Sequence, residues 1–537
     1  MRRALPSVAA SVLLSIGIGS RGEAAVITVS LGQSIQGAIS VAANDDVILV
    51  GPGLYAEAIT ILDKRITLRS VAGPANTILD ASGWMTSVVR IEGIASSGTL
   101  IEGFTFRGGE GGSYPFVTSS SGGGMFVIDA GITVRDCVFL NNRSNDRGGG
   151  AYVYGTTVAG PASTRFEDCA FIANRSNDGG GFAELGGRTV LSGCIFTGNS
   201  ALAGGGAHFG LPHDSRVEDC VFSSNDAKFL AGGGISVILS AQDTLRVVRS
   251  TLTGNHAGAG GGGIAMGTIG VVSTPRLFVE DSWIVRNVAD TGGGLQVFSG
   301  NPTVAELAHV LHVTIADNVA YGAGSGGGAG INCSNGARIR IDHSIIDGNV
   351  PNDHIVFVGT AFDSLIQGGV MGPGVFAADP GFVDRLHGDY HLAAGSICRD
   401  LGKLVSSPTF DVERDARAAG TKRDLGADEF HPHLYGGTPD SGGSPLTADV
   451  AVRAVGNPGD LVSVFVAGSL AQTPTQTTFG SFALSAPFAG PIVLGPLDGA
   501  GSLDVPFATS ATFVGVEVAV QAVIGGALTN AVVLTLQ

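Results

Sequence analysis

The sequence has few charged and few aromatic side chains for a chain of 537 residues. Charged residues make up 14% of the chain and aromatic residues 7%, and there are only 6 cysteines and 2 tryptophans. Soluble domains usually carry about a quarter charged residues. The low charge does not indicate disorder, because 44% of the residues are apolar and offer surface that folding can bury.

Three further deficits exclude whole classes of protein. Acidic residues outnumber basic ones 46 to 30, a formal net charge of −16, so phosphate backbones would repel the chain and we expect no nucleic-acid binding. After the N-terminus, no stretch offers about 18 uninterrupted apolar residues, so we expect no transmembrane segment in the mature chain. No ten-residue stretch has helical periodicity, which disfavours helical repeats.

The N-terminus has the pattern of a secretory signal peptide. Arg2 and Arg3 precede an apolar run from Val8 to Ile18, and small residues follow up to Ala25, which is the usual order in such signals. We therefore predict a signal peptide over residues 1–25. The mature chain is expected to be a monomer that is secreted or lies at the extracellular cell surface.

A glycine-rich repeat contrasts with these deficits. The chain contains 85 glycines, roughly twice the average usage. An apolar residue three positions before an asparagine recurs at spacings of 25 to 32 residues. The pairs are Phe139 with Asn142, Phe171 with Asn174, Phe196 with Asn199, Phe222 with Asn225, Leu252 with Asn255, Ile284 with Asn287, Ile315 with Asn318, and Ile346 with Asn349.

Each copy consists of short β-branched or aromatic segments broken by glycine, which is typical of strands. A repeat this short cannot close its own core, whereas coils stacked about 4.8 Å apart bury a continuous interior. Parallel crossovers are almost always right-handed. We therefore predict an all-β fold, a right-handed parallel β-helix over residues 26–430.

The eight asparagines are predicted to stack in a ladder, each side-chain amide bonding those of the adjacent coils. The alternative role is N-glycosylation, but only Asn142 and Asn174 begin an Asn-Arg-Ser triplet. Seven copies are followed by a glycine triplet, which we interpret as a turn with positive φ. No triplet is followed by Lys-Ser or Lys-Thr and a helix, so phosphate-binding loops are excluded.

A column of small side chains lies five residues before the asparagines. It comprises Cys137, Cys169, Cys194 and Cys220, followed by Ser250 and Ser282. Adjacent coils would bring the cysteine Cα atoms near disulfide range, and export permits oxidation. Side chains stacked in parallel seldom point at one another, so we expect buried free thiols. Zinc is not expected, because a straight column of sulfurs cannot surround one ion tetrahedrally.

A polar column lies immediately before the cysteine position. Its members are Asp136, Asp168, Gly193, Asp219, Arg249, Asp281, His312 and His343. One interpretation is a corner of the coil where short polar side chains satisfy turn amides and Arg249 neutralises neighbouring aspartates. The other is a metal site at Asp136 and Asp168, about 4.8 Å apart on adjacent coils with no base between them. Calcium suits oxygen ligands outside the cell and is the one cofactor we predict.

Residues 26–106 resemble the opening of the pectin-lyase-like β-helix superfamily. The resemblance rests on the short helix from Ser34, the strand from Asp46 to Val50, the turn Gly51-Pro-Gly and Tyr55. The Phe-x-x-Asn and Gly-Gly rhythm is similar to the repeats of the polymorphic outer-membrane proteins, a bacterial adhesin family. Roughly 100 residues follow the predicted helix, too few for the membrane barrel of that family.

Residues 389–430 are similar to the end of bacterial choice-of-anchor surface proteins. The match comprises Asp389-Tyr-His-Leu, Asp411, Arg417 and Asp424-Leu-Gly-Ala-Asp-Glu. The segment 431–445 is rich in Gly, Pro and Ser and is predicted to be a linker. Alternating runs after it predict a small β-sandwich over residues 446–537.

Catalytic motifs of this superfamily are missing from the sequence. We find neither the polygalacturonase set of Asn-Thr-Asp, paired Asp and Gly-His-Gly on a repeat strand nor the pectate-lyase Arg-x-Pro-x-x-Arg pattern, so we assign no catalytic residue. We expect a non-catalytic protein that binds or adheres to polysaccharide or cell-surface material. The alternative is a polysaccharide lyase or glycoside hydrolase of the pectin-lyase-like type, because the scaffold carries both.

Overall fold

A computed structural model describes most of the chain. The described residues are 24–430, apart from 115–116, 156–162, 271, 273, 275, 301–304, 323–327, 352–354, 357–358, 369–371, 403–409, 416 and 418–421, together with the backbone of strands between His433 and Thr535. The predicted signal peptide lies almost entirely outside them.

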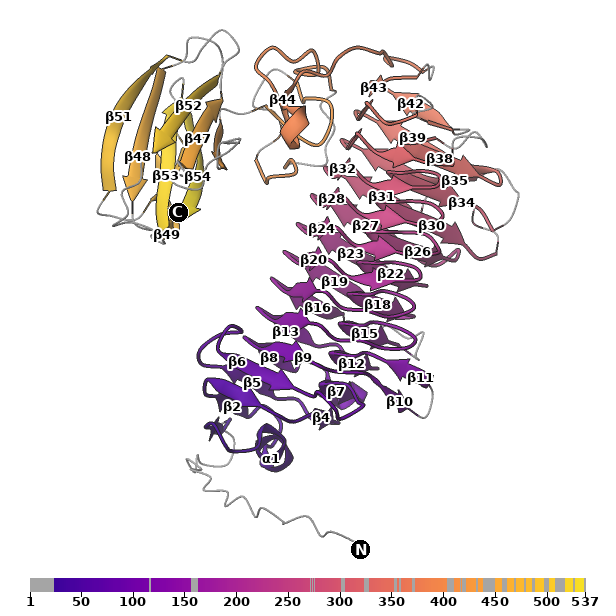
Figure 1. Ribbon diagram of the computed structural model, residues 1–537, viewed down its shortest axis with the longest axis vertical. Coiled ribbons are helices and arrows are strands. Elements are labelled where there is room, and N and C mark those ends of the chain that lie inside the picture. The colour runs from indigo at the N-terminus through magenta and orange to yellow at the C-terminus, as the bar shows by residue number, and fades with distance from the viewer. Residues whose placement is uncertain are drawn as a thin grey trace, which may run out of the picture. The chain divides into compact units, whose positions relative to one another are not determined.

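The described residues up to Ala377 wind into a stack of parallel coils (Figure 1). Each coil passes through three parallel sheets, which we name A, B and C, and some coils add a two-residue strand of a fourth, sheet D, between B and C.

Sheet A has 13 strands in the order β1 (Val26–Val29), β2 (Val47–Val50), β5 (Thr67–Ser70), β8 (Leu100–Glu102), β13 (Thr133–Arg135), β16 (Thr164–Glu167), β19 (Thr189–Ser192), β23 (Ser215–Glu218), β27 (Leu245–Val248), β31 (Leu277–Glu280), β35 (Ala305–Leu311), β39 (Ala337–Asp342) and β42 (Thr360–Phe362). Sheet B has 12 strands, β3 (Gly53–Tyr55), β6 (Thr77–Asp80), β9 (Thr105–Arg107), β14 (Val138–Leu140), β17 (Ala170–Ile172), β20 (Ile195–Thr197), β24 (Val221–Ser223), β28 (Thr251–Thr253), β32 (Trp283–Val285), β36 (Thr314–Ala316), β40 (Ile345–Asp347) and β43 (Leu365–Ile366). Sheet C has 11 strands, β4 (Ile59–Leu62), β7 (Val89–Glu92), β12 (Met125–Ile128), β15 (Ala151–Tyr154), β18 (Phe182–Leu185), β22 (Ala207–Gly210), β26 (Ile235–Leu239), β30 (Ile264–Thr268), β34 (Leu295–Phe298), β38 (Ile331–Ser334) and β41 (Ile355–Val356). Sheet D has 5 strands, β21 (Ser200–Ala201), β25 (Asp226–Ala227), β29 (His256–Ala257), β33 (Val288–Ala289) and β37 (Val319–Ala320).

Helical structure is rare, as the sequence predicts. The first coil carries α1 (Ile35–Val41), whose N-cap is Ser34, with its side chain accepting from the backbone N–H of Gly37 at 3.0 Å. Two 3-10 turns, η1 (Ile94–Ser96) and η2 (Arg385–His387), are the other helical pieces in the described part. None of the helices in that part is long and apolar enough to cross a membrane. A hairpin of β10 (Gly112–Tyr114) and β11 (Val117–Ser121) interrupts one coil.

Residues in the left-handed backbone region form the corners of each coil. In the coil that contains β16, β17 and β18, these are Asp168 (φ 53°), Ala173 (φ 54°) and Gly179 (φ 65°). The glycine is required at the third corner, because a Cβ on Gly179 would collide with the backbone carbonyl of Phe182. One residue per corner thus redirects the chain from each sheet to the next.

The interior of the coils is filled by columns of identical or similar side chains. Phe171 stacks on Phe196, and Phe196 on Phe222, each pair with ring centroids 4.5 Å apart and nearly parallel planes. All of these rings are fully buried. Burial of this continuous apolar column is the main stabilising contribution that a solenoid can make.

The asparagine ladder is confirmed. Oδ1 of Asn199 accepts from both the backbone N–H and Nδ2 of Asn174, at 2.9 and 3.0 Å, while Nδ2 of Asn174 also donates to the carbonyl of Phe139 at 2.8 Å. The same pattern runs from Asn142 to Asn349. Because Asn142 and Asn174 are each 1% exposed and their amides are bonded within the ladder, the glycosylation alternative does not fit this fold.

The cysteine column is also buried and consists of free thiols. Each sulfur lies near a backbone carbonyl. For example, Cys169 Sγ lies 3.3 Å from the carbonyl oxygen of Glu167. Burial raises the pKa of the Cys137 thiol to about 12, so this thiol stays protonated and unreactive at neutral pH. The interpretation as buried free thiols is therefore confirmed.

The parallel pairing ends with a single bridge between Leu365 and Phe376. Residues 411–414 belong to the same compact unit as the coils, whereas residues 378–410 and 415–537 form a second unit. The last paired coil thus precedes the predicted end of the β-helix at residue 430. The boundaries at 25, 430 and 445 stay predictions.

Strands of the second unit pair antiparallel. They are β44 (Phe382–Asp384), β45 (Asp389–Leu392), β46 (His433–Gly437), β47 (Val450–Val455), β48 (Leu461–Ala467), β49 (Leu470–Thr477), β50 (Gly480–Leu484), β51 (Phe488–Pro496), β52 (Ser502–Phe507), β53 (Glu517–Ile524) and β54 (Ala527–Thr535). The sheet orders are β44-β45, β46-β47-β52, β51-β48-β53-β54 and β49-β50. Strand β46 falls inside the predicted linker, and the β-sandwich over 446–537 stays a prediction.

Candidate functional site

The polar column predicted from the sequence forms the corner between sheets A and B, which we name the aspartate corner. Its members are Asp136, Asp168, Gly193, Asp219, Arg249, Asp281, His312, His343 and, beyond the predicted set, Asp363, all with φ between 42° and 64°. The backbone N–H of Asp168 donates to the carbonyl of Ser192 in the next coil at 2.9 Å, and the other coils repeat this bond. The column therefore lies at a corner of the coil, as predicted, but backbone carbonyls of the next coil, and not the polar side chains, accept from these corner amides.

Asp136 and Asp168 lie at this corner on adjacent coils, and both are exposed. Partial burial and the negative charges of Glu102 and Asp168 raise the pKa of Asp136. The Asp168 carboxylate leans toward the next coil, into the space where a Cβ on Gly193 would lie. The charged groups that act on Asp136 are both acidic, whereas Asp168 also lies near the cations Arg135 and Arg414, which the sequence interpretation did not include. Calcium binding by the two aspartates stays a prediction.

Asp219, at the same corner, is held by two arginines. Arg249 Nε and NH2 donate to its carboxylate at 2.8 and 3.0 Å, and Arg414 donates to the same two oxygens at 3.1 and 2.7 Å. Burial alone would raise the pKa of Asp219, but the hydrogen bonds from Arg414 and Arg249 outweigh it and hold the pKa below its usual value. Pairing with Arg249 is confirmed, whereas Arg414, 195 residues away in sequence, was not anticipated.

Further along the stack, the aspartate corner is buried. Asp281 and His312 are fully buried and His343 is 5% exposed. The two imidazole rings stack with centroids 5.0 Å apart, and His343 Nε2 lies 4.0 Å from Asp363 Oδ2. This part of the corner is therefore interior structure and offers no open surface to a ligand.

A second corner carries a pocket that the sequence analysis did not predict. We name it the asparagine corner; it comprises the ladder asparagines and the residues that follow each of them. A pocket of about 250 Å³ opens on it, and its lining residues are Arg143, Ser144, Asn145, Arg175, Ser176, Asn177, Ser200, Ala201, Leu202 and Lys228. We name this the basic pocket, because its three charged lining residues are all cationic.

Strand-like alternation explains why the cations face outward. Asn142 and Ser144 are buried, while Arg143 and Asn145 between and after them are exposed, as side chains alternate along an extended chain. The triplet Asn-Arg-Ser recurs at Asn174, one coil later. The backbones of Arg143 and Arg175 are paired in a parallel bridge, which places their backbones about one coil spacing, ~4.8 Å, apart.

The pocket keeps its positive charge because its cations are little neutralised. Arg175 and Lys228 form no ion pair with any residue that the structure describes, and Arg143 has only Glu110 at 3.8 Å. The nearest acid along the strand column is Asp226, whose Oδ1 bonds His256 Nδ1 at 2.8 Å. A cleft lined by one sign of charge concentrates ligands of the opposite sign.

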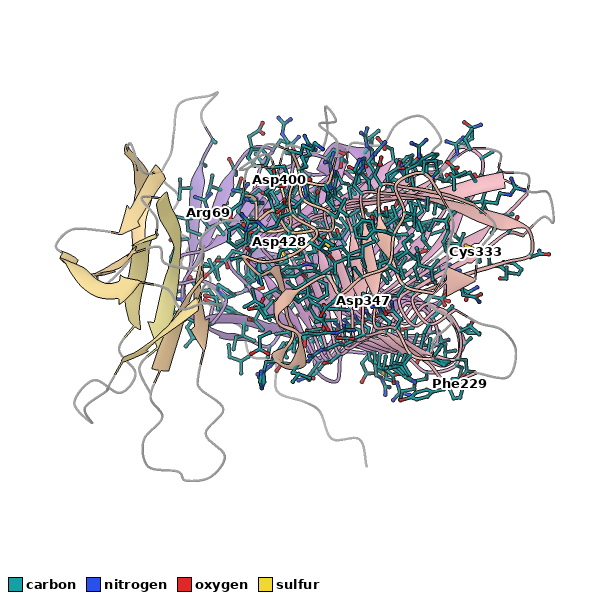
Figure 2. The ribbon with its side chains drawn as sticks, turned by 90° about the horizontal axis from the view of Figure 1, so that it is seen from above. Arg69, Phe229, Cys333, Asp347, Asp400 and Asp428 are labelled. Carbon is teal, nitrogen blue, oxygen red and sulfur yellow. The ribbon has the colours of Figure 1, made fainter. Side chains whose placement is uncertain are left out.

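Exposed apolar side chains border the pocket. Phe229 and Leu230, directly after Lys228, are 70% and 52% exposed, and Figure 2 shows Phe229 at the outer edge of the coils. The backbone N–H of Leu230 donates to the carbonyl of the lining residue Leu202 at 2.9 Å. An exposed aromatic ring next to Lys228 in sequence offers a flat apolar face near the pocket.

Comparisons with known proteins give two distant structural neighbours and one family match. No curated protein matches the sequence. The A-module of the mannuronan C-5 epimerase AlgE4 from Azotobacter vinelandii has 14% identity and a TM-score of 0.30, covering 64% of this chain and 94% of that one. A pectin methylesterase mutant in complex with a hexasaccharide has 12% identity and a TM-score of 0.19, covering 65% of this chain and 89% of that one. At these scores the structures differ widely, so neither assigns an activity here.

A family model gives the more specific result. Residues 91–269 match the model described as the right-handed β-helix region, which is less than half of the chain. These residues include the basic pocket and the first aspartates of the aspartate corner. The match and the parallel pairing of sheets A, B and C together identify residues 91–269 as a right-handed parallel β-helix.

Proposed function

We propose that this chain is a secreted or cell-surface protein that binds an acidic polysaccharide, without cleaving it, at the basic pocket. The observation that carries the proposal is the pairing of Arg143 and Arg175 on adjacent coils, with Lys228 in the same pocket. The chain as a whole has a net charge of −16, whereas the charged residues of this pocket are all basic. The pocket therefore attracts anionic ligands that the rest of the chain repels.

The spacing of the cations fits a linear polyanion. Arginines whose backbones lie about 4.8 Å apart on adjacent coils can bring two cations to successive anions of a polysaccharide that carries one carboxylate or sulfate per sugar. Arginine binds such groups with two parallel hydrogen bonds. Ser144, Asn145, Ser176 and Asn177 add the neutral hydrogen-bonding groups that sugar hydroxyls require, and Phe229 supplies an apolar surface for a sugar ring.

The lining favours binding over hydrolysis. Glycoside hydrolysis uses a pair of carboxylates, and none of the lining residues is acidic. The alternative of a lyase or hydrolase of the pectin-lyase-like type therefore has no support at this pocket. The resemblance of residues 389–430 to choice-of-anchor proteins remains a hypothesis about how the chain is attached to a surface.

Affinity electrophoresis through gels containing polyuronate, sulfated or neutral polysaccharide tests the proposal. The wild type should be retarded by acidic polysaccharides only. Arg143→Gln combined with Arg175→Gln should weaken this binding at least tenfold, about 1.4 kcal/mol or more. The matched control, Arg188→Gln with Arg216→Gln, removes the same charge from arginines that already pair with Asp214 and Glu218 and should bind normally.

Two results would contradict the proposal. Equal weakening in the control pair would show a non-specific charge effect, and retardation by neutral polysaccharides alone would remove the role of the cations. Release of reducing ends or unsaturated products from the same polysaccharides would instead make the chain an enzyme.

A further inference from the structure

Glu184 is an acidic side chain inside the coils. It lies on β18, where its Cα pairs with Val153 on one side and Phe209 on the other, and it is fully buried. The inward positions of the same column on other coils are apolar: Val127, Val153, Phe209, Val237, Met266 and Val297. One carboxyl group therefore interrupts a hydrophobic column.

The hydrogen bonds around Glu184 are too few to support a buried negative charge. Ser215 Oγ lies 2.9 Å from both carboxyl oxygens, yet it has one proton to donate, and it already accepts from the backbone N–H of Thr189 at 2.9 Å. The hydroxyl Oγ1 of Thr189 is buried near the carboxyl without a hydrogen-bond partner. No basic side chain pairs with Glu184 in the part of the chain that the structure describes.

The charged group that acts on Glu184 is another acid. Asp243 is 1% exposed; its Oδ2 accepts from the backbone N–H of Ser240 at 2.7 Å, and its Oδ1 lies 3.4 Å from His213 Nδ1. Asp243 is thus supported by its own partners, while its charge opposes a charge on Glu184. An ionised, poorly bonded carboxylate in an apolar interior is costly.

We propose that Glu184 is a neutral carboxylic acid in the folded coils, and that its ionisation is a pH-sensitive switch that loosens the coils at β18, β22 and β23. The bond from Ser215, the first residue of β23, joins sheet A to sheet C at this point. A carboxylate formed there draws water into the column between Val153 and Phe209. The loosening is local, because each coil contacts only its neighbours.

The direction of the pH dependence follows from the same groups. Burial raises the pKa of Glu184 to about 7, against the opposing influence of the nearby Thr189 hydroxyl and the hydrogen bond from Ser215, and Asp243 raises it further. In the unfolded chain the pKa is about 4.3. Because the folded pKa is the higher one, the stabilisation is complete below about pH 4, falls as the pH rises toward 7, and is lost above it.

Hydrogen exchange measured by mass spectrometry at pH 5.5 and 8.5, corrected for the intrinsic rates, tests the switch on the full chain. In the wild type, protection of residues 182–191 and 207–218 should fall at least tenfold at pH 8.5. Between the unfolded and the folded pKa of Glu184, the opening equilibrium rises about tenfold for each increase of one in pH. Residues 277–285 should not change. In Glu184→Gln the difference between the two pH values should vanish.

The matched control is Glu280→Gln, which removes a partly exposed acid already paired with Arg246 at 3.0 Å and should keep the wild-type pH response. If Glu184→Gln does not fold, Glu184→Leu supplies an apolar side chain suited to the column. Undiminished protection of the wild type at pH 8.5 would overturn the switch, as would an unchanged pH response in a folded Glu184 variant. Recovery of protection at pH 8.5 on addition of calcium or sodium, absent in the variant, would make Glu184 a cation ligand instead.

Discussion

The two corners that flank the strands of sheet B from β14 to β40 use the same backbone conformation and serve different purposes. Asp168 at the aspartate corner and Ala173 before Asn174 at the asparagine corner both have φ near 53°. At the asparagine corner, the ladder side chain turns inward and the next residue, Arg175, turns outward. At the aspartate corner the polar side chains themselves face outward over the first coils, so charge gathers there without an internal scaffold.

The difference shows how a solenoid separates structure from function. The ladder amides satisfy one another inside the coil, which leaves the adjacent outward position free to vary. Arg143, Arg175 and Lys228 make use of that freedom. At the aspartate corner the same side chains form the corner and carry the charge. Each charge there needs its own partner, as Asp219 has in Arg249 and Arg414.

Breaking the ladder should have the largest effect on stability. The Asn225 side chain accepts from Asn199 Nδ2 and donates to Asn255 Oδ1 and to the carbonyl of Phe196. Asn225→Leu leaves these buried groups without partners and should lower the free energy of unfolding by about 1 to 3 kcal/mol. Urea denaturation followed by circular dichroism measures this. Ser223→Ala, two residues away at a partly exposed position, is the control and should cost much less; equal losses would remove the ladder from the account.

Removing the charge of Asp219, which two arginines pair at the aspartate corner, should have an intermediate effect on the stability of the fold. Asp219→Asn weakens four charge-assisted bonds, but Arg414 is largely exposed, so the expected loss is about 1 kcal/mol at pH 7. Because the folded pKa of Asp219 is the lower one, the wild type keeps this contribution above about pH 4 and loses it below. The variant and the wild type should therefore converge in acid melts; a difference that persists at pH 3 would contradict this.

Removing the charge of Asp136 should change the stability less than Asp219→Asn does, and in the opposite direction. The pKa of Asp136 is raised by burial and by Glu102 and Asp168, so its charge disfavours the folded state once the pH exceeds that pKa. Asp136→Asn should leave the free energy of unfolding at pH 7, measured by urea denaturation, unchanged or raise it by no more than about 0.5 kcal/mol after solvent screening. A clear loss of stability would show that the carboxylate is needed as a ligand.

Added calcium should have the smallest effect on the stability of the fold. If Asp136 and Asp168 bind it, millimolar calcium should raise the melting temperature slightly, because the unfolded chain separates the two carboxylates. The rise should disappear in Asp136→Asn combined with Asp168→Asn and persist in Asp219→Asn. Unchanged melting of the wild type after chelation, together with no heat of binding by calorimetry, would leave the corner purely structural.

Features that repeat could be predicted from the sequence. The ladder from Asn142 to Asn349 and the buried Cys137 column recur at one position in successive copies, and a parallel solenoid turns such recurrence into vertical contact. The same logic paired Arg249 with Asp219. The N-terminal helix was expected from the resemblance of residues 26–106 to the pectin-lyase-like superfamily, and the structure shows Ser34 as its N-cap.

Features that depart from the repeat could not be predicted in this way. Arg414 reaches Asp219 from outside the repeats, and no spacing rule connects them. Glu184 occupies an inward position that is apolar in neighbouring coils, so its burial contradicts the polar character of its side chain. The basic pocket is not predicted by the glycosylation triplets, in which Arg143 and Arg175 are only the middle residues. The signal that the sequence does carry is the alternation that buries Asn142 and exposes Arg143.

The most direct test of the account compares the two corners in one binding measurement. Isothermal titration of an acidic oligosaccharide would be carried out with Arg143→Glu combined with Arg175→Glu, and separately with Asp136→Asn combined with Asp168→Asn. The account predicts that charge reversal at the asparagine corner abolishes binding, while removal of the aspartates leaves the affinity unchanged. Binding that survives the arginine reversal but is lost with the aspartates would contradict it and place the site at the aspartate corner.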